Sequence, residues 1–271
     1  MSTQATHLPL KGKTAIVTGA SRGLGAGMAY ELAQRGADVV LTYTSPSSSS
    51  LASVLEEKIS QLPHKPSTLS VMADLTKVDS PAEIVNSLKS WRSGDLKIDI
   101  LVNNAGIEKV KALGEITPED FSQVYDLNVR GALFMTQAIL PYLQSQGRII
   151  NISSVGSRSG FSNVGLYCSS KAALEGLTRC WAAELGGNGT TVNAVNPGPV
   201  ESDMLKRIPK EIVQKQKADT PIEKRLGTVE EVANVVAWLA GSDSGQSRKP
   251  KGRTGRSGPQ RTFHKMYYLP L

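Results

Sequence analysis

The sequence predicts an α/β fold: a single domain built on a doubly wound parallel sheet. Six short runs rich in β-branched residues alternate with longer segments in which apolar residues recur every three or four positions. Strands that alternate with helices make right-handed crossovers, and these build a parallel sheet with helices on both faces. A chain of 271 residues, 39% of them hydrophobic, is long enough to bury one full core of this kind.

The predicted elements follow one another in a regular order. We expect strands at 14–19, 37–43, 68–75, 98–106, 147–154 and 190–198, and helices at 24–34, 51–62, 81–91, 121–143 and 167–185. The polar stretch 201–218 contains one amphipathic helix and follows the sixth strand, where a lid over a site could lie. A last helix is expected at 229–239.

The charge of the chain is unevenly distributed. The net charge is +7, and seven of the 31 basic residues but none of the 24 acidic residues lie in 245–271. Gly, Ser, Pro, Lys and Arg dominate 242–261, so this segment is expected to be disordered. We therefore divide the chain into an N-terminal extension (1–10), a folded domain (11–241) and a basic, disordered tail (242–271).

The composition argues against several classes of protein. No run of about 18 apolar residues is present for a membrane span, and 1–13 lacks the apolar stretch of a secretory signal, so we expect a cytoplasmic protein. Two cysteines, Cys168 and Cys180, and three scattered histidines do not match the spacing of a zinc site. We therefore expect two reduced thiols and no metal.

A glycine-rich turn opens the first predicted helix. The segment Thr18 to Gly25 reads TGASRGLG and follows directly on the first strand. Glycines let the backbone turn sharply and approach a pyrophosphate, and the amides of a helix N-terminus favour the anion. This context predicts a bound dinucleotide, with a glycine turn that binds nothing as the competing interpretation. The predicted contacts are Gly19, Ser21, Arg22, Gly23, Leu24 and Gly25.

The end of the second strand favours NADP(H) over NAD(H). A carboxylate there would accept a hydrogen bond from the ribose 2′-hydroxyl and repel a 2′-phosphate. The chain instead has hydroxyls at Thr44 and Ser45, and Arg22 can place its guanidinium against the extra phosphate. An ordinary surface role for Arg22 is the alternative.

Two further strand ends contribute candidate cofactor contacts. Asp74 ends the third strand and could accept a hydrogen bond from the adenine amino group, although a helix N-cap is a competing use. Asn104, Ala105 and Gly106 end the fourth strand, where small residues let a cofactor lie against the backbone.

The candidate catalytic residues follow the fifth strand. Tyr167 and Lys171 are four apart in a helical pattern, so both side chains emerge on one face. A phenol has a pKa of about 10, and an ammonium within about 6 Å favours the phenolate, so Lys171 is the first candidate to lower that pKa. Ser154 ends the strand and can donate to a carbonyl oxygen on which charge develops. Its neighbour Ser153 is the rival, because consecutive strand residues face opposite ways.

At these residues the chain resembles the short-chain dehydrogenase/reductase family, which has a Rossmann-type fold. The resemblance covers about residues 11–240 and includes TGASRGLG, NNAG, NVRG, YCSSK and NPGPV. It implies that Tyr167 is the general acid/base, Ser154 polarises the substrate carbonyl, Lys171 assists Tyr167 and binds the nicotinamide ribose, and Asn128 holds a water for proton supply. The cofactor contacts implied or extended by it are Leu24, Asp74, Asn104, Arg130, Tyr167, Lys171, Pro197, Gly198, Val200 and Ser202.

The motifs look most like those of 3-oxoacyl carrier-protein reductases and fungal-type polyketide or polyhydroxynaphthalene reductases. We therefore expect an NADPH-dependent reductase of a small-molecule ketone, active in secondary metabolism. A cofactor-binding but catalytically impaired protein is the second hypothesis. A nucleic-acid binder acting through the tail is the third, disfavoured because Gly and Pro interrupt its basic residues.

The chain departs from the family after Ala240. Relatives continue into a seventh strand that ends in glycines, whereas this chain reads GSDSGQSRKPKGRTGRSGPQRTFHKMYYLPL. We therefore expect the seventh strand to be missing or altered. Since that strand helps to pack one interface of the family's homo-oligomers, its loss predicts a less stable protein or an altered assembly.

Overall fold

A parallel sheet organises the molecule. The computed structural model describes residues 8–93, 95–202, 205, 210–220, 223–242, 244 and 266–268. Its strands are ordered β3-β2-β1-β4-β5-β6-β7, and every neighbouring pair is parallel. The strands are β1 (Thr14–Val17), β2 (Asp38–Tyr43), β3 (Thr68–Met72), β4 (Ile98–Asn103), β5 (Leu143–Ile152), β6 (Thr191–Asn196) and β7 (Met266–Tyr268). The order reverses between β1 and β4, which is where α/β sheets of this type bind ligands.

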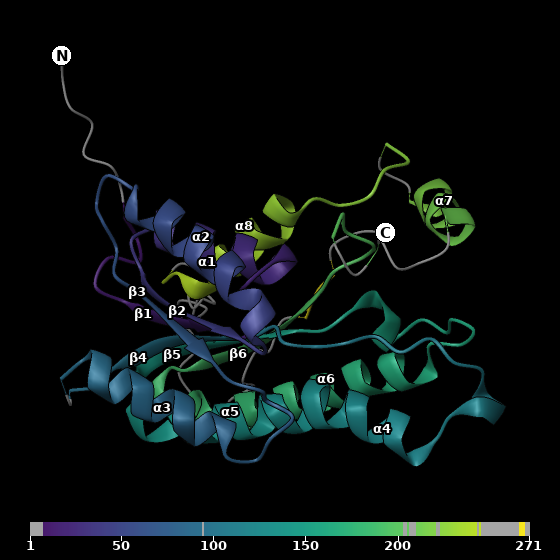
Figure 1. Cartoon of the computed structure of the whole chain (residues 1–271), viewed down its shortest axis with the longest axis horizontal. Helices are drawn as coiled ribbons and strands as arrows, with labels where there is room; N and C mark the ends of the chain where they lie inside the picture. Colours follow the sequence, from purple (N-terminus) through teal and green to yellow (C-terminus); the bar gives the residue numbers. More distant parts are fainter. Residues whose placement is uncertain are drawn as a thin grey trace, which may run out of the picture.

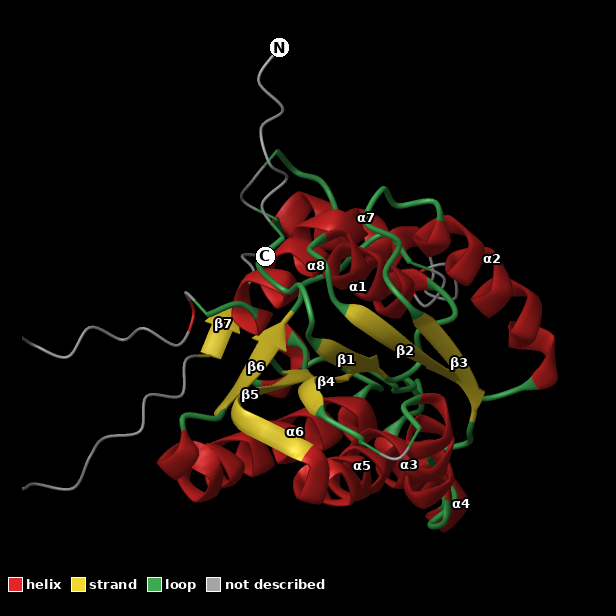
Figure 2. Cartoon of the chain, turned by 90° about the vertical axis from the view of Figure 1, so that its left-hand side faces the viewer, coloured by secondary structure: helices red, strands yellow, loops and turns green. Residues whose placement is uncertain are grey.

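Helices cover both faces of the sheet, as Figures 1 and 2 show. One face carries α1 (Gly23–Gln34), α2 (Ser49–Ser60) and α8 (Val229–Ala240), and the other carries α3 (Ser80–Trp91), α5 (Ala132–Ile139) and α6 (Gly165–Leu185). Two more helices are α4 (Pro118–Tyr125) and α7 (Lys210–Asp219). Both lie on the right-hand side of Figure 1, with α7 above and α4 below. The predicted doubly wound α/β fold is confirmed.

Alternation along the strands divides the core in two. On β1, Ala15 and Val17 pack with Met28 of α1 and Val236 of α8 in one cluster. Ile16, between them, faces the opposite way and joins a second cluster with residues of α3, α5 and α6. Because both faces of each central strand are buried, the strands read as continuous apolar runs in the sequence.

The helix predicted at 121–143 differs from the structure. The segment begins at Pro118 with a capping box on Thr117, and a π-helical turn, Asp126–Gly131, separates α4 from α5. Helix α5 ends at Ile139, and a short 3₁₀ turn containing Pro141 leads into β5 at Leu143. Proline cannot donate the helical hydrogen bond, which explains the early end. The π turn leaves the apolar periodicity almost unchanged, so the sequence did not indicate it.

The ends of the chain partly agree with the sequence analysis. Leu10, which we assigned to an extension, is 2% exposed and belongs to the core, with its amide bonded to the Arg35 carbonyl. A seventh strand is present but altered: three residues, Met266–Tyr268, pair with Ala194–Asn196 at the open edge of β6 (Figure 2). Most of the tail predicted to be disordered lies outside the described residues.

The turn between β1 and α1 leaves no room for a side chain at Gly25. Gly19 has a φ of +64°, in the left-handed region that favours glycine. A Cβ on Gly25 would lie 2.2 Å from the Gly19 carbonyl oxygen and 2.6 Å from Asn104 Nδ2. The first turn of α1 therefore lies directly against the backbone that leaves β1.

We expect Gly25→Ala to destabilise the protein and weaken dinucleotide binding, because the clash is with backbone atoms that cannot move aside. Overpacking of this kind costs about 1–3 kcal/mol. Thermal melts and cofactor titrations would measure both effects. Gly114→Ala is the matched control, since a Cβ at Gly114 meets nothing within 4 Å. Equal melting temperatures and cofactor affinities for the two variants would contradict the prediction.

Candidate active site

Four side chains predicted to be catalytic converge beyond the carboxyl end of β5. Ser154 follows directly on β5, Tyr167 and Lys171 lie in the first turns of α6, and Asn128 lies in the π turn. A hydrogen bond joins the hydroxyls of Ser154 and Tyr167. Lys171 Nζ lies 5.7 Å from the centre of the Tyr167 ring. The structure thus brings together the residues that the sequence analysis singled out.

Ser154, rather than Ser153, faces the phenol. Ser154 Oγ accepts a hydrogen bond from the Gly156 amide at 3.1 Å, which leaves its proton for the Tyr167 oxygen. Ser153 Oγ points into the protein, where it donates to Glu175 Oε1 at 3.2 Å and to the Lys171 carbonyl at 3.3 Å. The alternation of strand side chains therefore decides between the two serines.

Glu175 holds together the elements that carry Ser154. The residue is 3% exposed. Its carboxylate accepts hydrogen bonds from Ser153, Ser157 and Asn196, and it forms an ion pair with Arg158. Asn196 in turn donates to the Ser154 carbonyl at 3.1 Å. One buried carboxylate thus links α6 to the ends of β5 and β6, and the sequence analysis did not single it out.

Burial dominates the acidity of Tyr167 and Lys171. It raises the pKa of Tyr167 to about 12, against the opposing effect of the Ser154 hydrogen bond. Burial also lowers the pKa of Lys171 to about 8. Burial therefore sets the direction of both shifts, and the lowering of the Tyr167 pKa by Lys171 stays a prediction. The ammonium donates to the Ile152 carbonyl at 2.8 Å, and burial outweighs any help to the phenolate.

Asn128 fixes the loop that follows β4. Its Oδ1 accepts from the Ile107 amide at 2.9 Å, and its Nδ2 donates to the Ile107 carbonyl at 2.9 Å and to Ser170 Oγ at 3.0 Å. A Cβ on the preceding Gly106 would lie 3.2 Å from Asn128 Oδ1 and 3.3 Å from Lys171 Nζ. The π turn therefore places the side-chain amide of Asn128 against both the loop and α6. The water that the family resemblance implies at Asn128 stays a prediction.

The glycine turn is bound to the end of β4. Asn104 Nδ2 donates to the carbonyls of Thr18 and Gly19 at 2.8 and 3.0 Å. Thr18 Oγ1 accepts from the amides of Asn104 and Ala105, both at 3.0 Å. Thr18 was not predicted as a site residue, although its place in TGASRGLG was the available indication. The two strand ends form one rigid cradle.

The cradle fits a pyrophosphate. Helix α1 has no acidic residue in its first turn, and Arg22 at the N-cap makes no side-chain cap hydrogen bond. The amides at this helix end therefore remain suited to an anion, which the helix dipole also favours. Ser21, Gly23 and Leu24 lie in the same turn and are partly buried.

The residues predicted at the adenosine end lie on the same edge but differ in their contacts. Arg22 and Thr44 are exposed, and Ser45 is half-buried with its hydroxyl 2.8 Å from that of Ser47. Asp74 Oδ1 accepts from Thr76, so Asp74 closes a local turn, and Asp79 instead takes the N-cap of α3. Arg130 pairs with Asp126 at 2.9 Å and donates to the Thr76 carbonyl. A cofactor contact from Arg130 stays a prediction.

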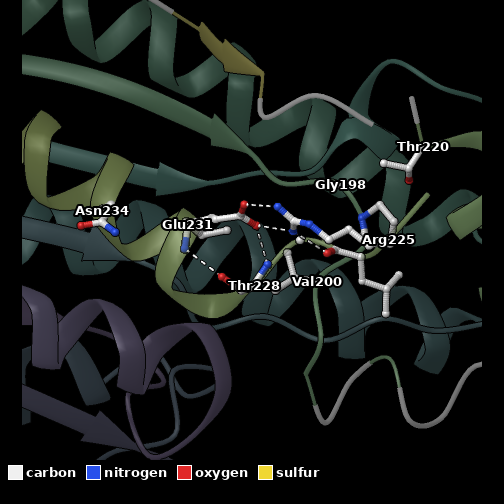
Figure 3. Close-up of a pocket in the computed structure, with 11 residues that line it drawn as sticks. Gly198, Val200, Thr220, Arg225, Thr228, Glu231 and Asn234 are labelled. Atoms are coloured by element: carbon white, nitrogen blue, oxygen red, sulfur yellow. Dashed lines mark hydrogen bonds and ion pairs between the residues drawn. The ribbon is translucent and has the colours of Figure 1, made fainter. Parts of the chain in front are cut away.

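A cavity of about 390 Å³ borders the loop after β6. Gly198 and Val200 form one wall, and Thr220, Arg225 and the start of α8 form the others, as Figure 3 shows. Arg225 donates two hydrogen bonds to Glu231, at 3.0 and 2.7 Å. Pro197 and Ser202 flank this loop, and the four predicted catalytic residues do not line the cavity. Of the predicted cofactor contacts, Gly198 and Val200 alone line this cavity.

Comparison with known proteins agrees with this geometry. Residues 19–247 match a family sequence model described as enoyl-(acyl carrier protein) reductase. Short-chain dehydrogenase/reductase FrzI from a Cladobotryum species is 42% identical over 234 residues, which are 84% of this chain and 88% of FrzI. The chain belongs to the short-chain dehydrogenase/reductase family. The family match ends close to where the sequence analysis found the departure.

Two further relatives extend the comparison within the short-chain dehydrogenase/reductases. Hydroxynaphthalene reductase arp2 from Aspergillus fumigatus is 37% identical over 257 residues, 90% of this chain and 91% of the relative. The crystal structure of a blue fluorescent protein from a metagenomic library, in complex with NADPH, is similar with a TM-score of 0.81 and 37% identity. The similarity covers 88% of this chain and 94% of that protein.

In the part of the chain that the structure describes, no helix is both long and apolar enough to cross a membrane, and no group of three or more His, Cys, Asp or Glu residues could hold a metal ion.

We expect Glu175→Gln to lower both stability and turnover, because one carboxylate oxygen becomes an NH2 donor. That donor then faces either the Arg158 guanidinium or the buried donors that share the other oxygen. Buried polar groups that lose a partner cost about 1–3 kcal/mol, and a displaced Ser154 should lower kcat about tenfold. Glu184→Gln, on an exposed part of the same helix, is the control. Thermal melts and steady-state rates that match between the two variants would contradict a positioning role.

We expect Lys171→Met to stabilise the protein most below pH 8. Since the Lys171 pKa is about 8 in the folded protein and has its usual value of 10.5 in the unfolded chain, the folded wild type binds fewer protons than the unfolded chain between these values. The free energy of unfolding of the wild type therefore rises with pH across this window. The variant should be more stable than the wild type by on the order of 3 kcal/mol at neutral pH, and this difference should shrink between pH 8 and 10.5. Urea unfolding of both proteins at pH 7 and pH 10 measures the difference. An advantage that grows with pH would contradict the assignment.

Proposed function

We propose that this protein is an NADPH-dependent reductase that transfers a hydride to a ketone, with Tyr167 as the proton donor. The observation that carries the proposal is the hydrogen-bonded pair Ser154 and Tyr167 at the carboxyl edge of the sheet, beside the buried ammonium of Lys171. Two hydroxyls that lie this close together can both reach a single carbonyl oxygen. This arrangement suits charge that develops on that oxygen.

The protonation states favour reduction. When bound, NADPH supplies the hydride for the carbonyl carbon. The Tyr167 phenol, whose pKa is about 12, carries its proton at neutral pH and can give it to the oxygen as the carbonyl π electrons move there. Ser154 donates to the same oxygen and orients it. The positive charge on Lys171, whose pKa is about 8, favours the phenolate left behind.

The preference for NADP(H) rests on charge at the adenosine end. The segment after β2 offers Thr44 and Ser45 and no carboxylate, and Arg22 stands exposed at the N-cap of α1. An arginine and hydroxyl donors suit a 2′-phosphate. The structural relative solved with NADPH supports the same choice.

The substrate is assigned by class. The proposed substrate is a ketone, 3-oxoacyl or polyketide-derived, reduced in the cytoplasm as part of secondary metabolism. Relatives named hydroxynaphthalene reductase and short-chain dehydrogenase/reductase support a reductase. The impaired cofactor-binding protein remains the second candidate, because β7 has only three residues and the family match ends at residue 247. Association into a homo-oligomer is proposed by analogy with the family, with an interface altered at β7.

We expect Tyr167→Phe to lower kcat for ketone reduction about 10²- to 10⁴-fold while NADPH binding is kept, because only the transferable proton is lost. NADPH oxidation with a panel of ketones, and fluorescence titration of NADPH, measure the two quantities. Tyr125→Phe, which removes a phenol hydroxyl bonded to Ser169 on the same helix α6, is the control. Full activity in Tyr167→Phe would rule out the assigned acid, and NADPH binding without turnover in the wild type would favour the impaired protein.

A further inference from the structure

An unpaired carboxylate, Glu108, stands beside the catalytic phenol. We propose that Glu108 is a specificity-determining residue that selects neutral ketones carrying a hydroxyl group and disfavours ketones carrying a carboxylate or phosphate. The inference rests on the proposed reductase function and deepens it by naming the substrate class. None of the predicted site residues covered this position.

The backbone on either side of Glu108 is fixed to the catalytic elements. Ile107 exchanges both of its backbone hydrogen bonds with the Asn128 side chain, next to the close approach of Gly106 to Lys171. Three residues after Glu108, the Lys111 amide donates to the Asn163 carbonyl at 2.6 Å, four residues before Tyr167. The segment 107–111 therefore passes from Lys171 to the start of α6, which places Glu108 along the side of Tyr167.

The neighbouring lysines turn away from Glu108. Lys109 and Lys111 both pair with Asp120 near the start of α4, at 2.8 and 2.6 Å. Among the described residues no cation pairs with Glu108. Its side chain is half-buried, burial raises its pKa, and its field reaches Tyr167 and Cys168. The carboxylate thus lies close enough to act on the phenol electrostatically, and no cation among the described residues pairs with it.

Such a carboxylate discriminates between substrates by charge and by hydrogen bonding. A half-buried carboxylate without a partner costs free energy, and groups of this kind cluster at functional sites. It accepts hydrogen bonds and cannot donate them while ionised. A ketone with a hydroxyl near its carbonyl supplies a donor, whereas an anionic group in the same place meets a like charge, which is unfavourable in a partly desolvated site.

The test compares matched substrates on wild type and on Glu108→Gln, Glu108→Ala and Glu108→Asp. The probes are 1-hydroxy-2-butanone with 2-butanone, and ethyl acetoacetate with acetoacetate, each assayed for NADPH oxidation. We expect Glu108→Gln to raise kcat/KM for acetoacetate relative to its ethyl ester about tenfold or more. We expect Glu108→Ala to lose about tenfold in the preference for 1-hydroxy-2-butanone over 2-butanone, and Glu108→Asp to keep both preferences. Glu115→Gln, an exposed carboxylate later in the same connection, is the control and should change neither ratio.

The outcomes separate this inference from the proposed function. Reduction of ketones by the wild type with ratios that Glu108→Gln and Glu108→Ala leave unchanged would overturn the role of Glu108 alone. Turnover of no ketone by the wild type would overturn the proposed function and this inference with it. A charge-dependent ratio that Glu115→Gln alters equally would assign the effect to net charge, which also overturns the inference.

Discussion

The parallel pairing of the central strands is the constraint on which the site depends. Because β1, β4, β5 and β6 all run in one direction, their carboxyl ends meet at one edge of the sheet, and the site residues follow those ends directly. Two sets of side-chain hydrogen bonds then fix the edge. Thr18 and Asn104 join the ends of β1 and β4, and Glu175 with Asn196 joins the ends of β5 and β6 to α6. The functional groups therefore rest on rigid elements and not on long loops.

Structural features that depend on local sequence pattern were predicted well, whereas features that depend on packing between distant segments were not. Hydrophobic periodicity and glycine spacing predicted the sheet and the glycine turn, because these follow from backbone geometry. They left Ser153 as a rival of Ser154, and the resemblance to the family supplied the roles of Ser154 and Tyr167. The π turn at Asp126–Gly131 and the role of Glu175 were missed, since apolar periodicity does not record a single extra helical residue or a buried contact between distant segments. The dominant effect of burial on the pKa of Tyr167 was also missed, because burial cannot be read from spacing.

The short β7 shows how the edge of the sheet is covered despite the unusual C-terminal sequence. Without β7, the outer edge of β6 would present a row of free backbone N–H and C=O groups. Such an edge is a template for pairing with another chain. Three residues, Met266–Tyr268, pair with Ala194–Asn196, toward the carboxyl end of β6. The cover therefore lies next to the loop that begins at Pro197, and the remaining length of β6, from Thr191 to Asn193, pairs only with β5 among the described residues.

Opposing effects on Tyr167 link the architecture to the chemistry. Burial and the field of Glu108 raise its pKa, whereas the Ser154 hydrogen bond lowers it, and the result keeps the proton on the phenol at neutral pH. The proposed reduction would benefit from this balance, because a proton donor must hold its proton until negative charge develops on the carbonyl oxygen. The buried Lys171 is held near its ionisation point by the same desolvation, so its charge becomes more favourable once the phenolate forms. Desolvation that costs stability therefore helps to couple the proton transfer to the reaction at the carbonyl.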